Sequence, residues 1–432
     1  AIKPVSFEEA VKVVKSGDRI HIHSVACAPQ GLIQALCARG RAGELKNIKL
    51  QHLHTEGAAP YAEQEFEGVF QLESYFVGHN VRKATQDGWA DYIPVHLSET
   101  QKLIRMGITP VDVAMIQVCP PDKHGYVSMG TSVDATLAAV QTAKTVIAVI
   151  NPNVPRAWGD AIIKLSDIDI FCEDNTPLIE AKPAQPSEQD IQIGKNCAGL
   201  IEDGACLQMG IGAIPNAVLS QLGNHKNLGI HTEMFADGVL PLVESGVING
   251  RNKAIDKGKM VSTFLMGSQK VYDFIDNNPG VAMMDVGYTN DPVIITKKPK
   301  VTAINSALSI DLTGQVNADS LGCKFYSGCG GQLDFIRGAA ASEGGKPIIA
   351  MPAITAKGIS KISPTLLNGA GVVTTRFDVH YVVTEYVVAD LYGKTLQDRA
   401  KALIRIAAPQ CQEELDKAAF ERFGSHFHFI TK

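Results

Sequence analysis

The sequence predicts an α/β protein made of two tandem, similar open domains whose sheets are mostly parallel. Apolar strand segments such as residues 111–118 and 145–150 alternate with helix-length segments, a pattern typical of parallel sheets. Only 6% of the residues are aromatic, whereas Ala, Gly, Val and Ile are plentiful, which suits strands covered by helices on both faces. The same strand and helix pattern begins a second time after residue 190.

A change in composition marks the expected boundary between the domains. Residues 177–189 contain three prolines and several charges without any hydrophobic period, which is typical of a linker. We therefore place an N-terminal domain at 1–185 and a C-terminal domain at 186–432. A chain of 432 residues is also long for a single core.

Motifs in the first half align with motifs in the second half. Gly17 aligns with Gly204, and Pro29 aligns with Pro215. His54-Thr55-Glu56 then aligns with His231-Thr232-Glu233. We interpret this order as a duplicated domain, with chance similarity of common strand–helix patterns as the alternative. Two such domains are expected to form a cleft between their strand ends, where ligands usually bind.

The elements follow from local signals. Ser6-Phe7-Glu8-Glu9 predicts a capped helix through Val14. In the first half we expect strands at 19–23 and 46–54, a helix beginning at Pro29, and loops with helical pieces over 58–92. The pattern further predicts a helix over 133–142. In the second half we expect helices at 191–201 and 215–222, and strands at 205–209 and 227–230.

Charge and cysteine content limit the function classes. A net charge of −5 argues against a nucleic-acid partner. The nine scattered cysteines lack zinc or disulfide spacing and are expected to be reduced thiols. No signal-peptide hydrophobic region and no apolar run of about 20 residues is present. The sequence thus predicts a cytoplasmic protein without a membrane partner.

Two glycine-rich segments are candidate ligand loops. Residues 210–216 join a strand to a helix, whose free N–H groups suit phosphate, although a tight structural turn explains the segment equally well. A dinucleotide site is a further possibility there, because Glu233 follows at the spacing of a ribose-binding acid, but Pro215 replaces the third glycine. Residues 327–335 carry three glycines in four positions, so main-chain N–H groups can form an oxyanion hole.

Glu233 follows the short strand 227–230, and carboxyl ends of strands are where α/β proteins bind ligands. Its repeat partner Glu56 has the same placement, and the residues alone do not decide between the two. The histidines form no complete metal ligand set, so we expect no metal. Cys329 has no histidine tied to it by spacing, which disfavours a thiol nucleophile.

Several motifs in the same order resemble the acetyl-CoA hydrolase/transferase family of class I CoA-transferases, with 4-hydroxybutyrate and butyrate coenzyme A transferases the most similar. The motifs are Gln208 to Val218, Gly229 to Met234, Asp256 to Lys259 and Gly328 to Phe335, with further similarity near both ends. The resemblance covers essentially the whole chain. It implies two CoA-transferase domains with the active site between them.

The resemblance also assigns residues. It makes Glu233, and not Glu56, the catalytic nucleophile. It places CoA-contacting or oxyanion-stabilising roles on nine positions: Gly210, Ile211, Gly212, Ala213, Ile214, Gly328, Gly330, Gly331 and Lys357. Gln208, Ser24, Cys329 and Gln332 are expected to line the active site. Relatives often carry an aliphatic residue where this chain has Cys329, so oxidation sensitivity is a possible addition.

The implied activity is transfer of CoA between a short-chain acyl-CoA, such as 4-hydroxybutyryl-CoA or butyryl-CoA, and a carboxylate such as acetate. CoA is then a substrate and a covalent glutamyl-CoA intermediate, with no permanently bound cofactor. An acyl-CoA hydrolase, a nucleotide-dependent oxidoreductase and a non-catalytic CoA-binding scaffold are the alternatives. Related enzymes are dimers or tetramers, which predicts a homo-oligomer.

Overall fold

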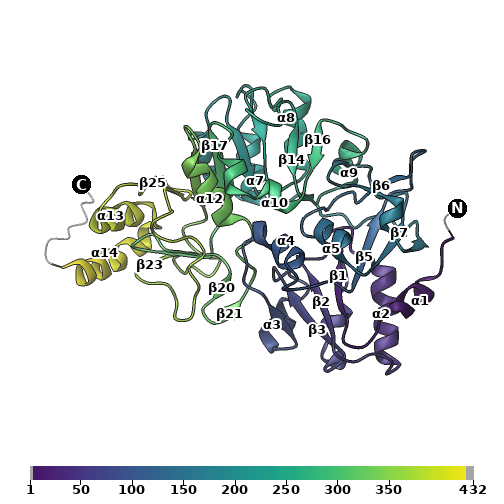
Figure 1. The fold of residues 1–432 in the computed structure, drawn as a ribbon. Coiled ribbons are helices and arrows are strands. Elements are labelled where there is room, and N and C mark those ends of the chain that lie inside the picture. Colours follow the sequence, from purple (N-terminus) through teal and green to yellow (C-terminus); the bar gives the residue numbers. More distant parts are fainter. Residues whose placement is uncertain (1–2, 425–432) are drawn as a thin grey trace. The chain divides into compact units, whose positions relative to one another are not determined.

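The computed structural model describes residues 3–424, which fall into two compact units (Figure 1). Unit 1 contains the chain up to Lys182 together with residues 259–291 and 325–330, and unit 2 contains the remainder. The first crossing, between Lys182 and Pro183, lies inside the expected linker. The two later segments return to unit 1, so each compact unit contains more than one stretch of the chain.

Unit 1 is built on a seven-stranded, all-parallel sheet. Its strands, in spatial order, are β10 (Ile170–Glu173), β7 (Thr145–Ile150), β5 (Val113–Val118), β1 (Arg19–Ile22), β2 (Ile48–His52), β3 (Phe70–Ser74) and β4 (Ala90–Tyr92). Every residue of β5 is buried, as expected for an apolar strand with both faces covered. The helices of unit 1 are α1 (Phe7–Ala10), α2 (Gln30–Arg41), α3 (Arg82–Asp87), α4 (Leu97–Arg105), α5 (Thr136–Thr142), α9 (Gln269–Ile275) and α10 (Val286–Thr289).

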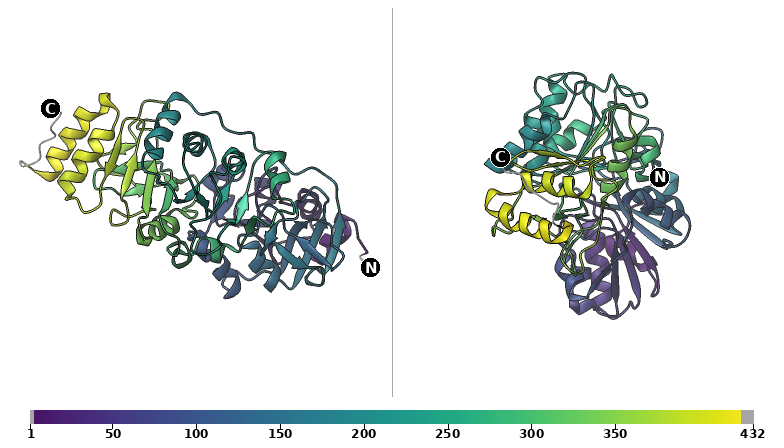
Figure 2. Two further views of the ribbon diagram at one scale, coloured as in Figure 1. Left: turned by 90° about the horizontal axis from the view of Figure 1, so that it is seen from above. Right: turned by 90° about the vertical axis from the view of Figure 1, so that its left-hand side faces the viewer.

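Unit 2 contains a six-stranded sheet that is parallel except at its last pair. Its strands, in spatial order, are β12 (Gly229–Ile230), β11 (Cys206–Met209), β17 (Val301–Asn305), β22 (Lys346–Ala350), β24 (Tyr381–Val383) and β25 (Val388–Asp390). Its helices are α6 (Glu188–Ala198), α7 (Ala213–Ser220), α8 (Leu240–Glu244), α11 (Pro292–Ile295), α12 (Gln332–Ala341), α13 (Leu396–Ile406) and α14 (Pro409–Phe423). Helices α13 and α14 lie side by side (Figure 2).

The two large sheets share one strand order. In unit 1, β1 lies between β2 and β5, and in unit 2, β11 lies between β12 and β17. The next strands also correspond, since β7 and β10 follow β5 as β22 and β24 follow β17. This common topology agrees with a duplicated domain, and it places the two His-Thr-Glu segments after equivalent strands.

Smaller strands complete the units. They are β6 (Tyr126–Ser128), β8 (Trp158–Gly159), β9 (Ile162–Lys164), β13 (Met234–Phe235), β14 (Met260–Ser262), β15 (Phe264–Leu265), β16 (Val281–Met283), β18 (Ser309–Asp311), β19 (Val316–Asn317), β20 (Ser320–Leu321), β21 (Lys324–Phe325) and β23 (Ile362–Ser363). Strands β14, β16 and β8 form a three-stranded parallel sheet, which ties residues 260–283 into unit 1. No helix within residues 3–424 is long and apolar enough to cross a membrane.

Local signals located the starts of α1 and α2, whereas α5 begins later than predicted and α6 and α7 begin earlier. The Ser6 hydroxyl accepts from the Glu9 N–H at 3.1 Å, as the capping box predicts, but α1 ends at Ala10 and continues as a 3-10 turn. Ser187 and Asp190 form a second capping box, so α6 begins earlier than the predicted residue 191. The prediction of loops over 58–92 is wrong for β3 and β4, because short outer strands with mixed polarity lack a clear apolar run.

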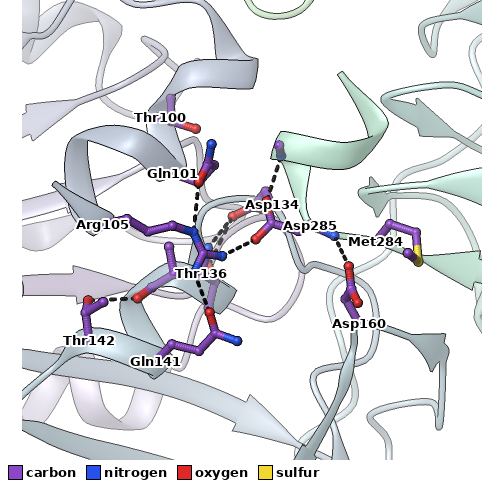
Figure 3. A network of polar contacts seen from close by, with 12 residues as sticks. Thr100, Gln101, Arg105, Asp134, Thr136, Gln141, Thr142, Asp160, Met284 and Asp285 are labelled. Carbon is purple, nitrogen blue, oxygen red and sulfur yellow. Dashed lines mark hydrogen bonds and ion pairs between the residues drawn. The ribbon is translucent and has the colours of Figure 1, made fainter. Parts of the chain in front are cut away.

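A half-buried ion pair joins the returning segment 259–291 to the rest of unit 1 (Figure 3). Arg105, the last residue of α4, donates to Asp285 at 2.6 Å and to Gln101 at 2.8 Å. The Asp285 carboxylate also accepts from the Gly287 N–H, and the Asp285 N–H donates to Asp160 at 2.9 Å. Burial raises the pKa of Asp285, and the hydrogen bond from the Gly287 N–H and the Arg105 charge oppose this shift.

Replacing Arg105 by methionine is therefore expected to lower the free energy of unfolding of unit 1 by about 1–3 kcal/mol, the cost of leaving a buried polar group without its charged partner. Adding Asp285→Asn should restore part of the loss, because the unpaired charge is removed. Lys83→Ala, which breaks the exposed pair with Asp87, should change stability by less than about 0.5 kcal/mol. Denaturant unfolding measures the stability of all three variants. Equal losses of stability in Arg105→Met and Lys83→Ala would contradict a stabilising role for the Arg105–Asp285 ion pair.

Candidate active site

Glu233 lies where a buried strand of unit 2 ends. Strand β12 pairs with β11, and the pairing continues one residue further because the His231 N–H donates to the Leu207 carbonyl at 3.1 Å. His231 and Thr232 are buried, whereas Glu233 is only half-buried. The backbone thus carries the carboxylate from the interior of the sheet to its carboxyl edge, the place where α/β proteins bind ligands.

Thr232 fixes the backbone on both sides of Glu233. Its hydroxyl lies 3.0 Å from the Met209 carbonyl at the end of β11 and 2.9 Å from the Met234 carbonyl. The hydroxyl oxygen also accepts from the Met209 N–H at 3.3 Å. Sequence reasoning missed this role, although the repeated threonine of His-Thr-Glu was a signal for it. The Thr232 side chain, which is part of the Glu233 segment, therefore holds this segment to the end of β11.

The first glycine segment lies beside these residues. Gly210 to Gly212 connects β11 to α7, and a side chain at Gly210 would approach the Met234 methyl at 3.9 Å. Gly212, which precedes α7, has φ of 127°, a conformation that only glycine adopts readily. Ala213 and Ile214, predicted as loop, form the first turn of α7, and Pro215 follows where no intrahelical N–H is needed.

The loop and the Glu233 segment share one narrow crevice within unit 2. Gly210, Ile211, Thr232 and Met234 line it together with mostly apolar side chains. Its volume is about 10 Å³, the space of roughly one water molecule. The structure therefore brings the predicted loop and the predicted carboxylate segment together, with the start of α7 offering N–H groups to an anion.

Gln208 and Gln332 are buried side chains with separate polar partners near the carboxyl ends of β11 and β17. Gln208 and Asn305 exchange two amide hydrogen bonds of 3.3 and 3.1 Å. Gln332, the first residue of α12 after Gly331, donates to the Ser306 carbonyl at 2.7 Å and accepts from the Thr374 hydroxyl at 2.8 Å. These contacts give both glutamines a defined orientation. Asn305 was missed because a lone asparagine at a strand end carries no sequence signal.

The second glycine segment divides between the units. Gly328, Cys329 and Gly330 lie in unit 1, whereas Gly331 lies in unit 2. A side chain at Gly328 would come within 2.9 Å of the Phe76 ring, so the close approach of the two chain segments requires glycine. The Gly330 carbonyl accepts from the Leu97 N–H at 3.0 Å. The segment is thus attached to the chain around residues 76–97.

Cys329 has a histidine neighbour that its sequence spacing did not reveal. Its sulfur lies 3.7 Å from His96 Nδ1 and donates toward the Val95 carbonyl at 3.1 Å. Residues 233 positions apart in the chain meet here, so no local motif indicates the pair. The thiol is half-buried.

Ser24 and Lys357 occupy contrasting positions. The Ser24 hydroxyl is fully buried in unit 1 and donates to the Asp134 carboxylate, which also accepts from the Thr136 N–H at 3.0 Å. Burial raises the pKa of Asp134. Lys357 is exposed in a turn of unit 2 closed by the Gly358 N–H to the Thr355 carbonyl.

Glu56, the twin of Glu233, has its own surroundings in unit 1. Its carboxylate lies 3.9 Å from His79 Nε2, and burial raises its pKa. The preceding Thr55 hydroxyl accepts from Asn80 at 3.1 Å instead of joining two carbonyls as Thr232 does. Within residues 3–424 no three His, Cys, Asp or Glu side chains are grouped to hold a metal ion.

Comparison with known proteins covers nearly the whole chain. Family models of the acetyl-CoA hydrolase/transferase N-terminal and C-terminal domains match residues 2–180 and 267–419. The chain is 51% identical over 418 residues to the succinyl-CoA:acetate/propanoyl-CoA:succinate CoA transferase of Fasciola hepatica, covering 96% of this chain and 87% of that protein. It is 47% identical to the 4-hydroxybutyrate coenzyme A transferase of Clostridium kluyveri over 98% of both chains. The crystal structure of RipA from Yersinia pestis matches with a TM-score of 0.92 at 35% identity, over 98% of both chains.

Proposed function

Because the chain belongs to the acetyl-CoA hydrolase/transferase family and is a CoA-transferase by its full-length similarity to such enzymes, we propose that Glu233 is its covalent nucleophile. The observation that carries the proposal is the contact of the Glu233 segment with the glycine loop. Thr232 holds this segment to the end of β11, and Gly210 lies against Met234. The Glu233 segment thereby lies beside a loop whose main-chain N–H groups can contact CoA.

The reaction proceeds in balanced steps. The Glu233 carboxylate attacks the acyl-CoA carbonyl, the C–S bond breaks, and CoA thiolate leaves an acyl-glutamyl anhydride. The thiolate then attacks the glutamyl carbonyl, which releases the free acid and forms a glutamyl-CoA thioester. A second carboxylate runs the same steps in reverse and departs as the new acyl-CoA. Thioester energy is conserved throughout, and no redox step is involved.

We propose a role in these reaction steps for each of the two glycine segments. The N–H groups of residues 210–214 are proposed to contact CoA. Main-chain N–H groups of residues 328–331 are proposed to stabilise the oxyanion that develops on the attacked carbonyl. Binding of the long pantetheine arm supplies energy that is used at the reacting carbonyl.

For the acyl group we propose a short chain, 4-hydroxybutyryl or butyryl, with acetate as the acceptor. The succinate and propanoate in the name of the Fasciola relative make these two acids necessary members of any substrate panel. The alternative is an acyl-CoA hydrolase, in which water replaces the acceptor acid. Product analysis with and without acetate separates the two, because a transferase releases new acyl-CoA only when acetate is present.

The covalent step has a direct test. Incubating the protein with butyryl-CoA and no acceptor should increase its intact mass by one CoA bound through a thioester. Borohydride should reduce this thioester and leave an alcohol at residue 233, which peptide mass spectrometry locates. Turnover without any mass increase would overturn the covalent assignment. Continuous CoA release with an adduct present would instead favour the hydrolase.

A further inference from the structure

Lys253 is a buried lysine whose ammonium group contacts the strand that leads to Glu233. The residue is 2% exposed, and its Nζ donates to the Ile230 carbonyl at 3.0 Å. Ile230 is the last residue of β12 and lies three positions before Glu233. A lysine so deeply buried is uncommon and is kept where its charge has a defined partner.

The geometry of β12 explains why this contact matters. The strand has two residues and forms the edge of its sheet. The N–H groups of Gly229 and His231 donate to the neighbouring strand segment, so the intervening Ile230 points its carbonyl to the outer side. An edge carbonyl that is buried without a donor is costly. Lys253 supplies the donor there.

The lysine stem also lies along the strand. A side chain at Gly229 would come within 3.0 Å of Lys253 Cγ and 3.1 Å of Cδ, which is tighter than ordinary contact. The absence of a side chain at this position therefore gives the stem its path to the carbonyl. Glycine and lysine are 24 positions apart in the chain, so they form a packed pair that only the fold creates.

We propose that Lys253 is a positioning residue that holds the end of β12 and thereby fixes the backbone from which Glu233 projects. The inference rests on the proposed role of Glu233 as nucleophile. Lys253 acts together with Thr232, because one side chain fixes the outer edge of the segment while the other joins its inner edge to β11. Loosening either contact allows the carboxylate to leave its attacking position.

The charges around Lys253 make the contact sensitive to pH. The pKa of Lys253 is lowered to about 8, mainly by burial and in part by the Lys298 charge, while Cys206 and Asp256 oppose the shift. Near and above pH 8 the ammonium group loses its proton, and a neutral amine is a weaker hydrogen-bond donor than a charged one. The rate of adduct formation is therefore expected to fall on the alkaline side.

Lys298 provides a matched control. It is fully buried, lies near the same Cys206 and Asp256, and pairs with Asp256 at 3.5 Å instead of with β12. Lys298→Met removes a buried lysine charge from the same unit without touching the Ile230 carbonyl. Its effect on stability should resemble that of Lys253→Met, but its effect on the reaction should not.

The experiment is rapid-mixing measurement of glutamyl-CoA formation from butyryl-CoA between pH 7 and 9.5. Lys253→Met should slow adduct formation by about tenfold to a hundredfold, the effect of a small misplacement of a reacting group, with KM little changed. It should also lose the alkaline decline. Gly229→Ala, which displaces the lysine stem, should slow the step in the same direction and serves if Lys253→Met does not fold. Lys298→Met should keep the rate at pH 7 and still show the decline, which should move to higher pH because a positive charge that lowers the pKa of Lys253 is removed.

A folded Lys253→Met that forms adduct at the wild-type rate with the same alkaline decline would overturn the inference. Equal slowing of adduct formation in Lys298→Met would also overturn the inference. It would mean that losing either buried lysine affects the reaction only through the stability of unit 2. Adduct in Glu233→Ala is a different outcome, which overturns the proposed function itself. The two failures are therefore distinguishable.

Discussion

Replacing Glu233 by glutamine is expected to lower kcat/KM for CoA transfer by at least about a thousandfold, the scale seen when a covalent nucleophile is removed. Glutamine keeps the shape of the side chain but lacks the carboxylate that attacks the acyl carbonyl. The backbone contacts of Thr232 do not involve the altered group, so the fold should be retained. Steady-state transfer from butyryl-CoA to acetate measures the loss, and circular dichroism checks the fold.

The chain offers a matched control in the first copy of the motif. Glu56→Gln changes the equivalent residue, which lies beside His79 in unit 1. This variant should still form the glutamyl-CoA adduct, because the proposed nucleophile is intact. If Glu56→Gln abolished the adduct and Glu233→Gln kept it, the nucleophile would belong to the first copy. Retention of the adduct in both variants would exclude a covalent role for either glutamate.

Acidification is expected to destabilise unit 1 strongly between pH 6.5 and 4. Burial lowers the pKa of four histidines, to about 3 for His21 and to about 4 for His23, His52 and His54. The unfolded chain binds these protons near pH 6.5, whereas the folded chain resists them, so stability falls as the pH falls through this window. Each group contributes up to about 1.4 kcal/mol per pH unit.

Buried carboxyl groups oppose part of this effect. Burial raises the pKa of Asp134, Asp285 and Glu56, so these groups favour the folded state as the pH falls. Repulsion among the histidines also couples their titrations, which makes the four contributions less than additive. A domain with about 5–15 kcal/mol of stability should nevertheless lose most of it before pH 4.

Tryptophan fluorescence isolates this transition, because both tryptophans of the chain, Trp89 and Trp158, belong to unit 1. Urea unfolding at several pH values gives the slope of the free energy of unfolding against pH. His54→Gln should reduce it by about 1 kcal/mol per pH unit. The same change at the exposed His124 should leave the slope unaltered. A stability of unit 1 that is constant from pH 6.5 to 4.5 would contradict the prediction.

The sequence by itself determined the features that depend on local pattern. The apolar runs of β5 and β7, the Ser6 helix cap and the glycine loop before α7 were predictable, because each is set by neighbouring residues. The order of repeated motifs further indicated one topology used twice, which the two sheets share. Glu233 was singled out from Glu56 by resemblance, since both follow equivalent strands.

Only the tertiary structure decided which distant residues meet. The return of residues 259–291 to unit 1, the pairing of Cys329 with His96, and the contact of Lys253 with β12 all join segments whose separation in sequence carries no pattern. Short outer strands such as β3 were missed for the same reason, because their pairing comes from the sheet and not from their own composition. The local sequence thus places Glu233 at the end of a strand, whereas the fold brings together the distant residues that contact its segment.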